Sequence, residues 1–180
     1  DSTGAENTVT TTTKGSVNAD GDFVYDLGAM GTLTLKDGSE ISVGANSSEK
    51  KLVNFITDAT KAVDKTTWFT MDRLYFESGK NTLKASSQEQ FKTLATILKA
   101  YPTIELKLGG YTDNTGDSVK NVALSQQRAE TAKNELVKMG IDAKRLTAEG
   151  YGPQFPVCTI SDSKECLAQN RRIDIRVTKK

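Results

Sequence analysis

One loop and the helix that follows it carry the side chains best suited to ligand recognition. The loop, YTDNTGDS, contains Asp113 and Asp117, and the helical segment after it contains Asn121, Ser125 and Arg128. At 3.6 residues per turn, the last three side chains lie on one face of the helix, and Arg128 lies roughly 10 Å along the helix from the loop. An aspartate and an arginine separated in this way can take the two ends of a zwitterion, because the carboxylate accepts from an ammonium and the guanidinium forks onto a carboxylate.

The same two charges also have a purely structural interpretation. Aspartates just before a helix often cap it, and a single arginine on a helix is often solvated. The run Asn170-Arg171-Arg172 fits an exposed turn before a strand, and Tyr111 fits a place in the core better than a stacking surface. Spacing alone leaves both interpretations open.

The composition excludes most catalytic sites. The 180 residues include no histidine, so a Ser-His-Asp triad, a Cys-His pair, a histidine-ligated zinc and a histidine general base are ruled out. The 24 Lys and Arg residues against 23 Asp and Glu leave a formal net charge of +1, which provides no field to hold a nucleic acid or an anionic membrane surface. We therefore expect a non-enzymatic domain without a cofactor or a metal.

The only two cysteines, Cys158 and Cys166, lie in one polar stretch, CTISDSKEC. Because the chain has no other Cys or His, a tetrahedral metal site is excluded. A local disulfide is favoured over two free thiols, and it indicates an oxidising compartment. No segment approaches the roughly 20 apolar residues of a membrane-spanning helix.

Strands and helices are predicted to alternate from Trp68 to the C-terminus. Period-two alternation of apolar and polar residues indicates strands, and apolar residues three and four apart indicate helices. The order is β-α-β-α-β-β, an α+β two-layer sandwich with the helices on one face of the sheet. The predicted elements are a strand at 68–76, a helix at 86–101, a strand at 104–110, a helix at 119–139 ended by Gly140, a strand at 146–151 and a strand at 173–177.

The residues before Trp68 are predicted to form two further regions. Residues 1–21 contain almost no large apolar side chain, which predicts a flexible linker. In residues 22–67, apolar residues alternate with polar ones on both sides of Asp37-Gly38, which predicts a β-hairpin. Apolar residues at helical spacing after Ser48 predict a helix behind this hairpin.

Several motifs in the second half of the chain occur together in one known family. They are, in order, GGYTDNTGD at 109–117, Asn121, LSQQRA at 124–129, Gly140-Ile141, RLTAEGYG at 145–152 and NRRIDI at 170–175. In their order and spacing, residues 68–180 closely resemble the OmpA-like peptidoglycan-binding domain. The resemblance implies a β-α-β-α-β-β fold that holds Gram-negative envelope proteins to the cell wall. It implies that the domain grips the diaminopimelate side chain of the stem peptide without cutting it.

The resemblance also implies a role for six residues. Asp113 is expected to bind the ammonium of the ligand, and Arg128 is expected to bind its carboxylate. Four further residues are expected to assist: Thr112 and Asn121 through hydrogen bonds, Leu124 as a contact that flanks the pocket, and Arg171 as a second cation.

Two positions depart from the family pattern. Tyr111 stands where members usually have histidine, which removes histidine-dependent tuning and leaves the Asp113–Arg128 pair intact. The turn Glu77-Ser78-Gly79 stands where many members have Asp or Asn, so its contacts are expected to come from the backbone. The segment between Cys158 and Cys166 lies where some members also carry a loop with a disulfide.

The same resemblance suggests a cellular location. The expected protein is a lipoprotein of the outer membrane, facing the periplasm, with peptidoglycan as its partner and no nucleic acid. Its tether would be a lipidated cysteine just before Asp1, with residues 1–21 as the spacer.

Two alternatives remain open beside this reading. One is a wall-acting hydrolase with Asp113, Asp117 or Glu149 as paired carboxylates. The other is an envelope scaffold that docks a partner protein through residues 22–66.

Overall fold

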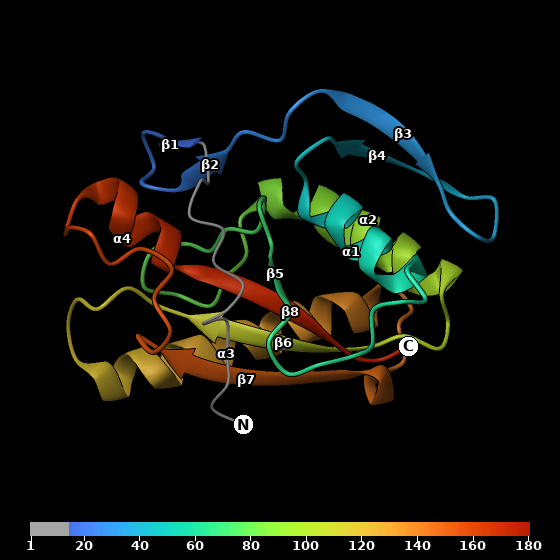
Figure 1. Ribbon diagram of the computed structural model, residues 1–180. Coiled ribbons are helices and arrows are strands. Elements are labelled where there is room, and N and C mark those ends of the chain that lie inside the picture. The colour runs from blue at the N-terminus through green and yellow to red at the C-terminus, as the bar shows by residue number, and fades with distance from the viewer. Residues whose placement is uncertain (1–14) are drawn as a thin grey trace.

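The computed structural model describes residues 15–180 and has a four-stranded sheet at its centre (Figure 1). Strands β6 (Glu105–Tyr111) and β7 (Leu146–Gly152) run parallel, whereas β8 (Arg172–Lys179) is antiparallel to both β5 (Trp68–Thr70) and β6. The last strand of the chain therefore lies inside the sheet, beside the strand that leads into the loop of Asp113. The strand order is β5, β8, β6, β7.

Helices α2 (Gln88–Ala100) and α3 (Ser118–Lys138) pack on one face of this sheet. The apolar residues that alternate along β6 and β8, such as Leu108 and Ile175, are fully buried in one hydrophobic cluster with residues of both helices, such as Leu98 and Leu136. The predicted α+β order β-α-β-α-β-β is confirmed. Within residues 68–180, the first strand is shorter than predicted, since β5 ends at Thr70. Three short elements of this region were not predicted: the 3-10 turns η2 (Ala85–Ser87) and η3 (Ala143–Arg145), and helix α4 (Lys164–Asn170) between β7 and β8.

The sequence LSQQRA places α3 unusually close to the sheet. A side chain at Gly110 of β6 would lie far inside contact distance of the Ser125 carbonyl oxygen, and one at Gly150 of β7 would meet the backbone nitrogen of Gln126. The helix also bonds to β7 directly, because Ser125 Oγ accepts from Gly152 N at 2.9 Å and Gln126 Oε1 accepts from Gly150 N at 2.7 Å. Glycines in the strands and polar side chains on the helix together fix the height of α3 above the sheet.

The N-terminal hairpin and helix predicted in residues 22–67 are present. Strands β3 (Met30–Thr34) and β4 (Glu40–Gly44) pair across Asp37-Gly38, and α1 (Ser48–Thr57) follows them. Ile41 and Leu52 belong to the same hydrophobic cluster as α2 and the central sheet. This region therefore shares one core with residues 68–180.

A buried polar network joins α1 to the rest of the molecule. Glu49, which has no exposed surface, forms an ion pair with Arg73. Asp72 accepts from the backbone nitrogen of Ser48 at 2.9 Å and from Gln90 Nε2 at 2.8 Å. Because buried charges are tolerated only when they are paired and hydrogen-bonded, these contacts fix where α1 meets α2.

The linker predicted over residues 1–21 lies mostly outside the described residues, but its last part is structured. Strand β1 (Gly15–Val17) pairs antiparallel with β2 (Phe23–Tyr25). Between them, the Asn18 side-chain oxygen accepts from the backbone nitrogens of Asp20 and Asp22 at 3.0 Å each. A polar Asx-type turn therefore holds residues 15–21, and the linker prediction missed it because it considered only apolar burial.

The cysteine loop is closed as predicted, with a disulfide between Cys158 and Cys166. Asn170, at the end of α4, accepts from the backbone nitrogen of Cys158 at 2.9 Å and donates to its carbonyl at 2.9 Å. Asn170 and Arg172 are buried, so the open interpretation of Asn170-Arg171-Arg172 as an exposed turn does not hold for these two residues. The two hydrogen bonds between Asn170 and Cys158 hold the loop against the start of β8.

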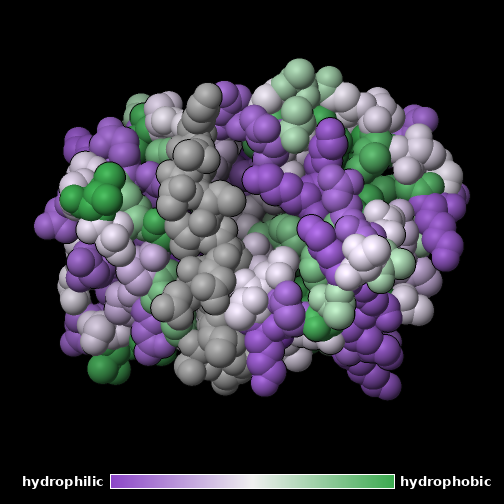
Figure 2. All heavy atoms as spheres, viewed as in Figure 1, coloured by the Kyte–Doolittle hydropathy of each residue, from purple (hydrophilic) through white to green (hydrophobic). Residues whose placement is uncertain are grey.

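Hydrophilic and hydrophobic residues are interspersed on the face of the molecule that Figure 2 shows. Within residues 15–180, no helix is both long enough and apolar enough to cross a bilayer.

The close approach of α3 predicts a position-specific effect of one methyl group. Gly110→Ala should lower the free energy of unfolding by about 1–3 kcal/mol, because the backbone of α3 must move away from β6. Gly31→Ala is the matched control, since a side chain at Gly31 in β3 would meet nothing within 4 Å. Urea unfolding of both variants checks this. Equal stability of Gly110→Ala and the parent would contradict the close packing.

Candidate functional site

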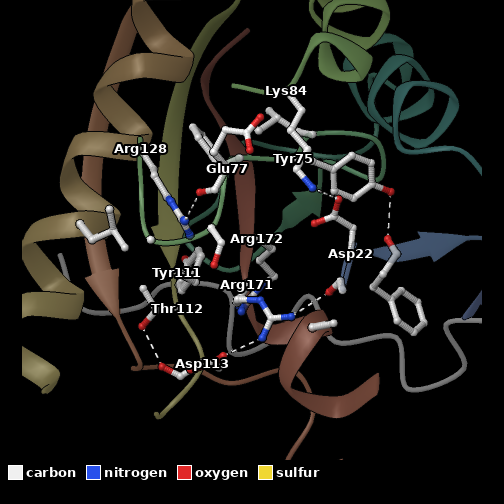
Figure 3. A pocket seen from close by; sticks show the side chains of 18 of the residues that line it. Asp22, Tyr75, Glu77, Lys84, Tyr111, Thr112, Asp113, Arg128, Arg171 and Arg172 are labelled. Atoms are coloured by element: carbon white, nitrogen blue, oxygen red, sulfur yellow. Dashed lines mark hydrogen bonds and ion pairs between the residues drawn. The ribbon is translucent and has the colours of Figure 1, made fainter. Parts of the chain in front are cut away.

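A cavity of about 590 Å³ opens where the loop after β6, helix α3, the turn at residues 77–79 and the β1–β2 hairpin meet (Figure 3). Helix α4 and the start of β8 complete its lining. The structure brings together every residue that the sequence assigns to ligand binding. The six that line this one cavity are Thr112, Asp113, Asn121, Leu124, Arg128 and Arg171.

Asp113 is held as a carboxylate anion at one side of the cavity. Its Oδ1 accepts from the backbone nitrogen and the hydroxyl of Thr115, and its Oδ2 accepts from Arg171 Nη1 at 2.7 Å. Burial by itself would raise the pKa of Asp113, but the hydrogen bonds from Thr115 and the positive charge of Arg171 outweigh it and hold this pKa below its ordinary value of 3.8. Asp113 is therefore ionised at neutral pH.

Arg128 projects from α3 into the cavity and is only 8% exposed. Its Nε donates to the carbonyl of Lys80 at 2.8 Å, its Nη2 donates to the carbonyl of Glu77 at 3.3 Å, and its guanidinium lies 5.0 Å from the centre of the Phe76 ring. Burial, and secondly the charge of Arg171, lower the pKa of Arg128, yet a guanidinium keeps its proton. Within residues 15–180, no carboxylate pairs with it.

Arg171 connects two walls of the cavity. It follows α4 directly, and it donates from Nη1 to Asp113 and from Nη2 to the carbonyl of Gly21 at 2.9 Å. The first contact spans 58 residues of sequence and the second spans 150. Arg171 thus lines the cavity beside Asp113 and anchors the β1–β2 hairpin.

Thr112 and Asn121 shape the loop around Asp113. Thr112 Oγ1 donates to the carbonyl of Asp113 at 2.8 Å, and Asn121 Nδ2 donates to the carbonyl of Thr115 at 2.8 Å. These bonds fix the backbone that presents the Asp113 carboxylate. Leu124 contributes an apolar side chain to the lining beside them.

The purely structural role considered for the loop aspartates, capping of the helix, belongs to Asp117 and not to Asp113. Asp117 caps α3, because its carboxylate accepts from the backbone nitrogens of Val119 and Lys120 at 2.8 and 3.2 Å. Asp113 bonds to Thr115 and Arg171 instead, and Arg128 is buried rather than solvated. The backbone of the turn at Glu77 reaches the cavity, since its carbonyl accepts from Arg128, and a backbone contact from this turn to a ligand stays a prediction.

Several residues of the cavity escaped the sequence analysis. Arg172 stacks at 4.0 Å over the ring of Tyr111, which is buried as expected, and bonds to Asp174 Oδ2 at 3.0 Å. A further set comes from the N-terminal hairpin and the segments that it contacts. No local pattern indicates that set, because its members approach the site only through the tertiary fold. They are Asp20, Gly21, Asp22, Phe23, Tyr25, Tyr75 and Lys84.

Comparison with known proteins places the matched region in one family and one fold. The model of the OmpA family matches residues 75–171. The chain is 39% identical over 103 residues to "Probable lipoprotein YiaD" of Escherichia coli, covering 57% of this chain and 47% of that protein. It is 31% identical over 101 residues to "Peptidoglycan-associated lipoprotein" of Agrobacterium fabrum, covering 56% of each. The chain thus spans about half the length of these relatives.

Two solved structures are similar to this chain as well. The peptidoglycan-associated lipoprotein from Burkholderia pseudomallei aligns with a TM-score of 0.55 and 30% identity, over 58% of this chain and 88% of that one. The cell wall anchor of the T6SS from Pseudomonas aeruginosa aligns with a TM-score of 0.56 and 28% identity, over 74% of this chain and 97% of that one.

The lowered pKa of Asp113 predicts a pH-dependent contribution to stability. Because folding favours the ionised carboxylate, the parent should exceed Asp113→Asn in stability by a constant amount above the ordinary pKa of 3.8. This excess should shrink as the pH falls through the lowered pKa of the folded state. Urea unfolding of both proteins between pH 7 and pH 2 measures it, and a difference that stays constant over that range would contradict the assigned contacts.

Proposed function

The chain belongs to the OmpA family, and on that premise we propose that it binds peptidoglycan non-covalently and anchors the outer membrane to the cell wall. The names of its relatives support this proposal, because they include peptidoglycan-associated lipoproteins and a cell wall anchor. The finer proposal is that the ligand is the diaminopimelate side chain of the stem peptide, whose free end is a zwitterion.

One observation carries this proposal: Arg128 is a buried cation that lines a cavity without a carboxylate partner among residues 15–180. Carbonyl groups stabilise its guanidinium only in part, because a buried charge is best compensated by an opposite charge. The carboxylate of diaminopimelate supplies that charge. Arg128 already uses Nε and Nη2 on the turn, so Nη1 and the second proton of Nη2 are the donors that remain for the ligand.

Asp113 suits the ammonium at the same end of the ligand. A carboxylate offers about four acceptor positions. Thr115 and Arg171 occupy three of them, through the backbone nitrogen and hydroxyl of the former and Nη1 of the latter. One position remains for the ligand ammonium, and a shift of Arg171 would free another. Thr112 and Asn121 hold the backbone of the loop, so it would keep its place if Arg171 moved away from Asp113.

The structure gives little support to a wall-acting hydrolase. Of the three carboxylates considered for that reaction, only Asp113 lines the cavity, since Asp117 caps α3 and Glu149 pairs with Lys107 Nζ at 2.7 Å. A general acid needs a raised pKa, whereas the pKa of Asp113 is lowered. We therefore propose a binding role without catalysis.

The proposed location is the periplasmic face of the outer membrane. Relatives are named as lipoproteins and as an outer membrane porin, which supports an association with the envelope. The disulfide between Cys158 and Cys166 fits an oxidising compartment. A lipid tether that precedes Asp1 remains part of this proposal.

Binding to purified sacculi tests the two assigned charges. Arg128→Ala should weaken binding at least about tenfold, because a charge-assisted bidentate contact is lost. Arg128→Lys should recover only part of the affinity, since an ammonium cannot fork onto a carboxylate. Asp113→Ala should weaken binding similarly, and the double variant should lose less than the sum of the two, because both charges hold one small group.

Asp117→Asn is the matched control, because asparagine is an equally good helix cap and Asp117 does not line the cavity. Thermal unfolding first shows that each variant is folded. Binding of Arg128→Ala and Asp113→Ala at the level of the parent would contradict the site. Release of soluble muropeptides by the parent protein would contradict the absence of catalysis.

A further inference from the structure

The β1–β2 hairpin forms a wall of the cavity, although it lies outside the residues that match the family. Residues 20–23 and Tyr25 line the cavity, and Figure 3 shows Asp22 on the side away from Arg128. Figure 1 shows the hairpin beside α4, far along the chain from it. The cavity is therefore built from two parts of the chain, and only one of them belongs to the matched region.

Three polar contacts hold this wall in place. Tyr75 Oη donates to the carbonyl of Phe23 at 2.9 Å, Arg171 Nη2 donates to the carbonyl of Gly21 at 2.9 Å, and Lys84 Nζ lies 2.6 Å from Asp22 Oδ2. Phe23 is buried as well. A short two-stranded ribbon is marginal alone, so these contacts are what position the hairpin beside the site.

Lys84 is the cation that this arrangement brings into the cavity. Its side chain and that of Asp22 are each 19% exposed, and both residues line the cavity. The hydrogen bond to Asp22 raises the pKa of Lys84, and the nearby carboxylates of Asp20 and Glu77 add to this effect, so the amine stays charged. An ammonium has three donors, and within residues 15–180 only Asp22 accepts from Lys84 Nζ, which leaves two donors.

From this geometry we propose that Lys84 and the hairpin form a second subsite, which binds a carboxylate of the stem peptide other than the one on the diaminopimelate side chain. The inference rests on the proposed function and extends it. In a stem peptide whose diaminopimelate side-chain end is free, the amino groups of the main chain are taken up in amide bonds. Its remaining ionic groups are therefore carboxylates, and their natural partner is a cation. Lys84 is the cavity cation on the hairpin side that has donors to spare.

The subsite predicts a preference between two forms of one ligand. The probe is the N-acetylated tripeptide of L-alanine, γ-linked D-glutamate and diaminopimelate, with the side-chain end of diaminopimelate left free. The comparison ligand has the D-glutamyl and C-terminal carboxylates converted to amides. The parent should bind the acid form about fivefold more tightly than the diamide, a modest ratio because Lys84 is partly exposed and already paired with Asp22.

Calorimetric titration of both ligands into Lys84→Met and into a matched control identifies the cause of that preference. Methionine keeps most of the length of the side chain and removes its charge, so Lys84→Met should bind the two forms equally well. Lys120→Met removes a cation from the exposed first turn of α3, outside the cavity lining, and should keep the preference of the parent. The ratio of two dissociation constants is compared within each variant, so it does not depend on the fraction of folded protein.

The outcomes separate this inference from the function on which it rests. Binding of both ligands by the parent, with the same ratio in the parent and in Lys84→Met, would overturn the subsite and leave the Asp113–Arg128 site standing. A parent that binds neither ligand would overturn both. Loss of the preference in Lys84→Met, with retention in Lys120→Met, is the result that supports the subsite.

Discussion

The contact between α3 and the parallel strands β6 and β7 is the constraint on which the rest of the site depends. A methyl group at Gly110 or Gly150 would collide with the helix backbone, and Ser125 bonds directly to the backbone of β7. The loop with Asp113 must join β6 to a helix held at this height. Arg128 lies three residues beyond Ser125, just under one helical turn, and must then point toward the turn at residues 77–80. The distance between α3 and the sheet thus determines where the charges of Asp113 and Arg128 lie.

The charges of the cavity are mostly paired within the protein. Asp113 is bonded to Arg171, Lys84 to Asp22, and Arg172 to Asp174. Arg128 differs, since carbonyl oxygens are its hydrogen-bond partners in the described part of the chain. The zwitterionic side-chain end of the proposed diaminopimelate ligand would bring one charge for Arg128 and an equal opposite charge for Asp113. That end would therefore enter without changing the net charge of the cavity, which would limit the electrostatic cost of binding in a partly desolvated site.

The N-terminal part of the described chain is integrated with the family domain in two ways. Apolar residues of β4 and α1 enter the common hydrophobic cluster, and Glu49 of α1 pairs with Arg73 in its interior. The β1–β2 hairpin then reaches the ligand cavity, where Asp22 meets Lys84. Residues 15–57 therefore contribute both to the hydrophobic core and to the lining of the cavity, and their removal would disturb both. Partner docking through residues 22–66 stays a hypothesis beside this structural role.

Local patterns were sufficient for the longer elements of the fold. Apolar alternation predicted β6 and β8, helical spacing predicted α3 to within one residue at each end, and Gly140 ends it in the left-handed conformation that glycine favours. The short hairpin at residues 15–25 was missed, because three-residue strands around a polar turn carry no periodic signal. Helix α4 was missed for a similar reason, since seven residues give fewer than two full turns of pattern.

By itself the sequence determined the order of elements, the absence of histidine chemistry, and, through its motifs, the six residues that meet in one cavity. Only the tertiary structure decided which partners these six residues contact. It joins Arg171 to Asp113 and Gly21, turns Arg128 onto the carbonyls of residues 77 and 80, and adds Lys84 and Asp22 as a further charged pair. The physical reason is that such contacts join residues 48 to 150 positions apart in the sequence. Their geometry follows from how the layers pack, and no spacing along the chain encodes it.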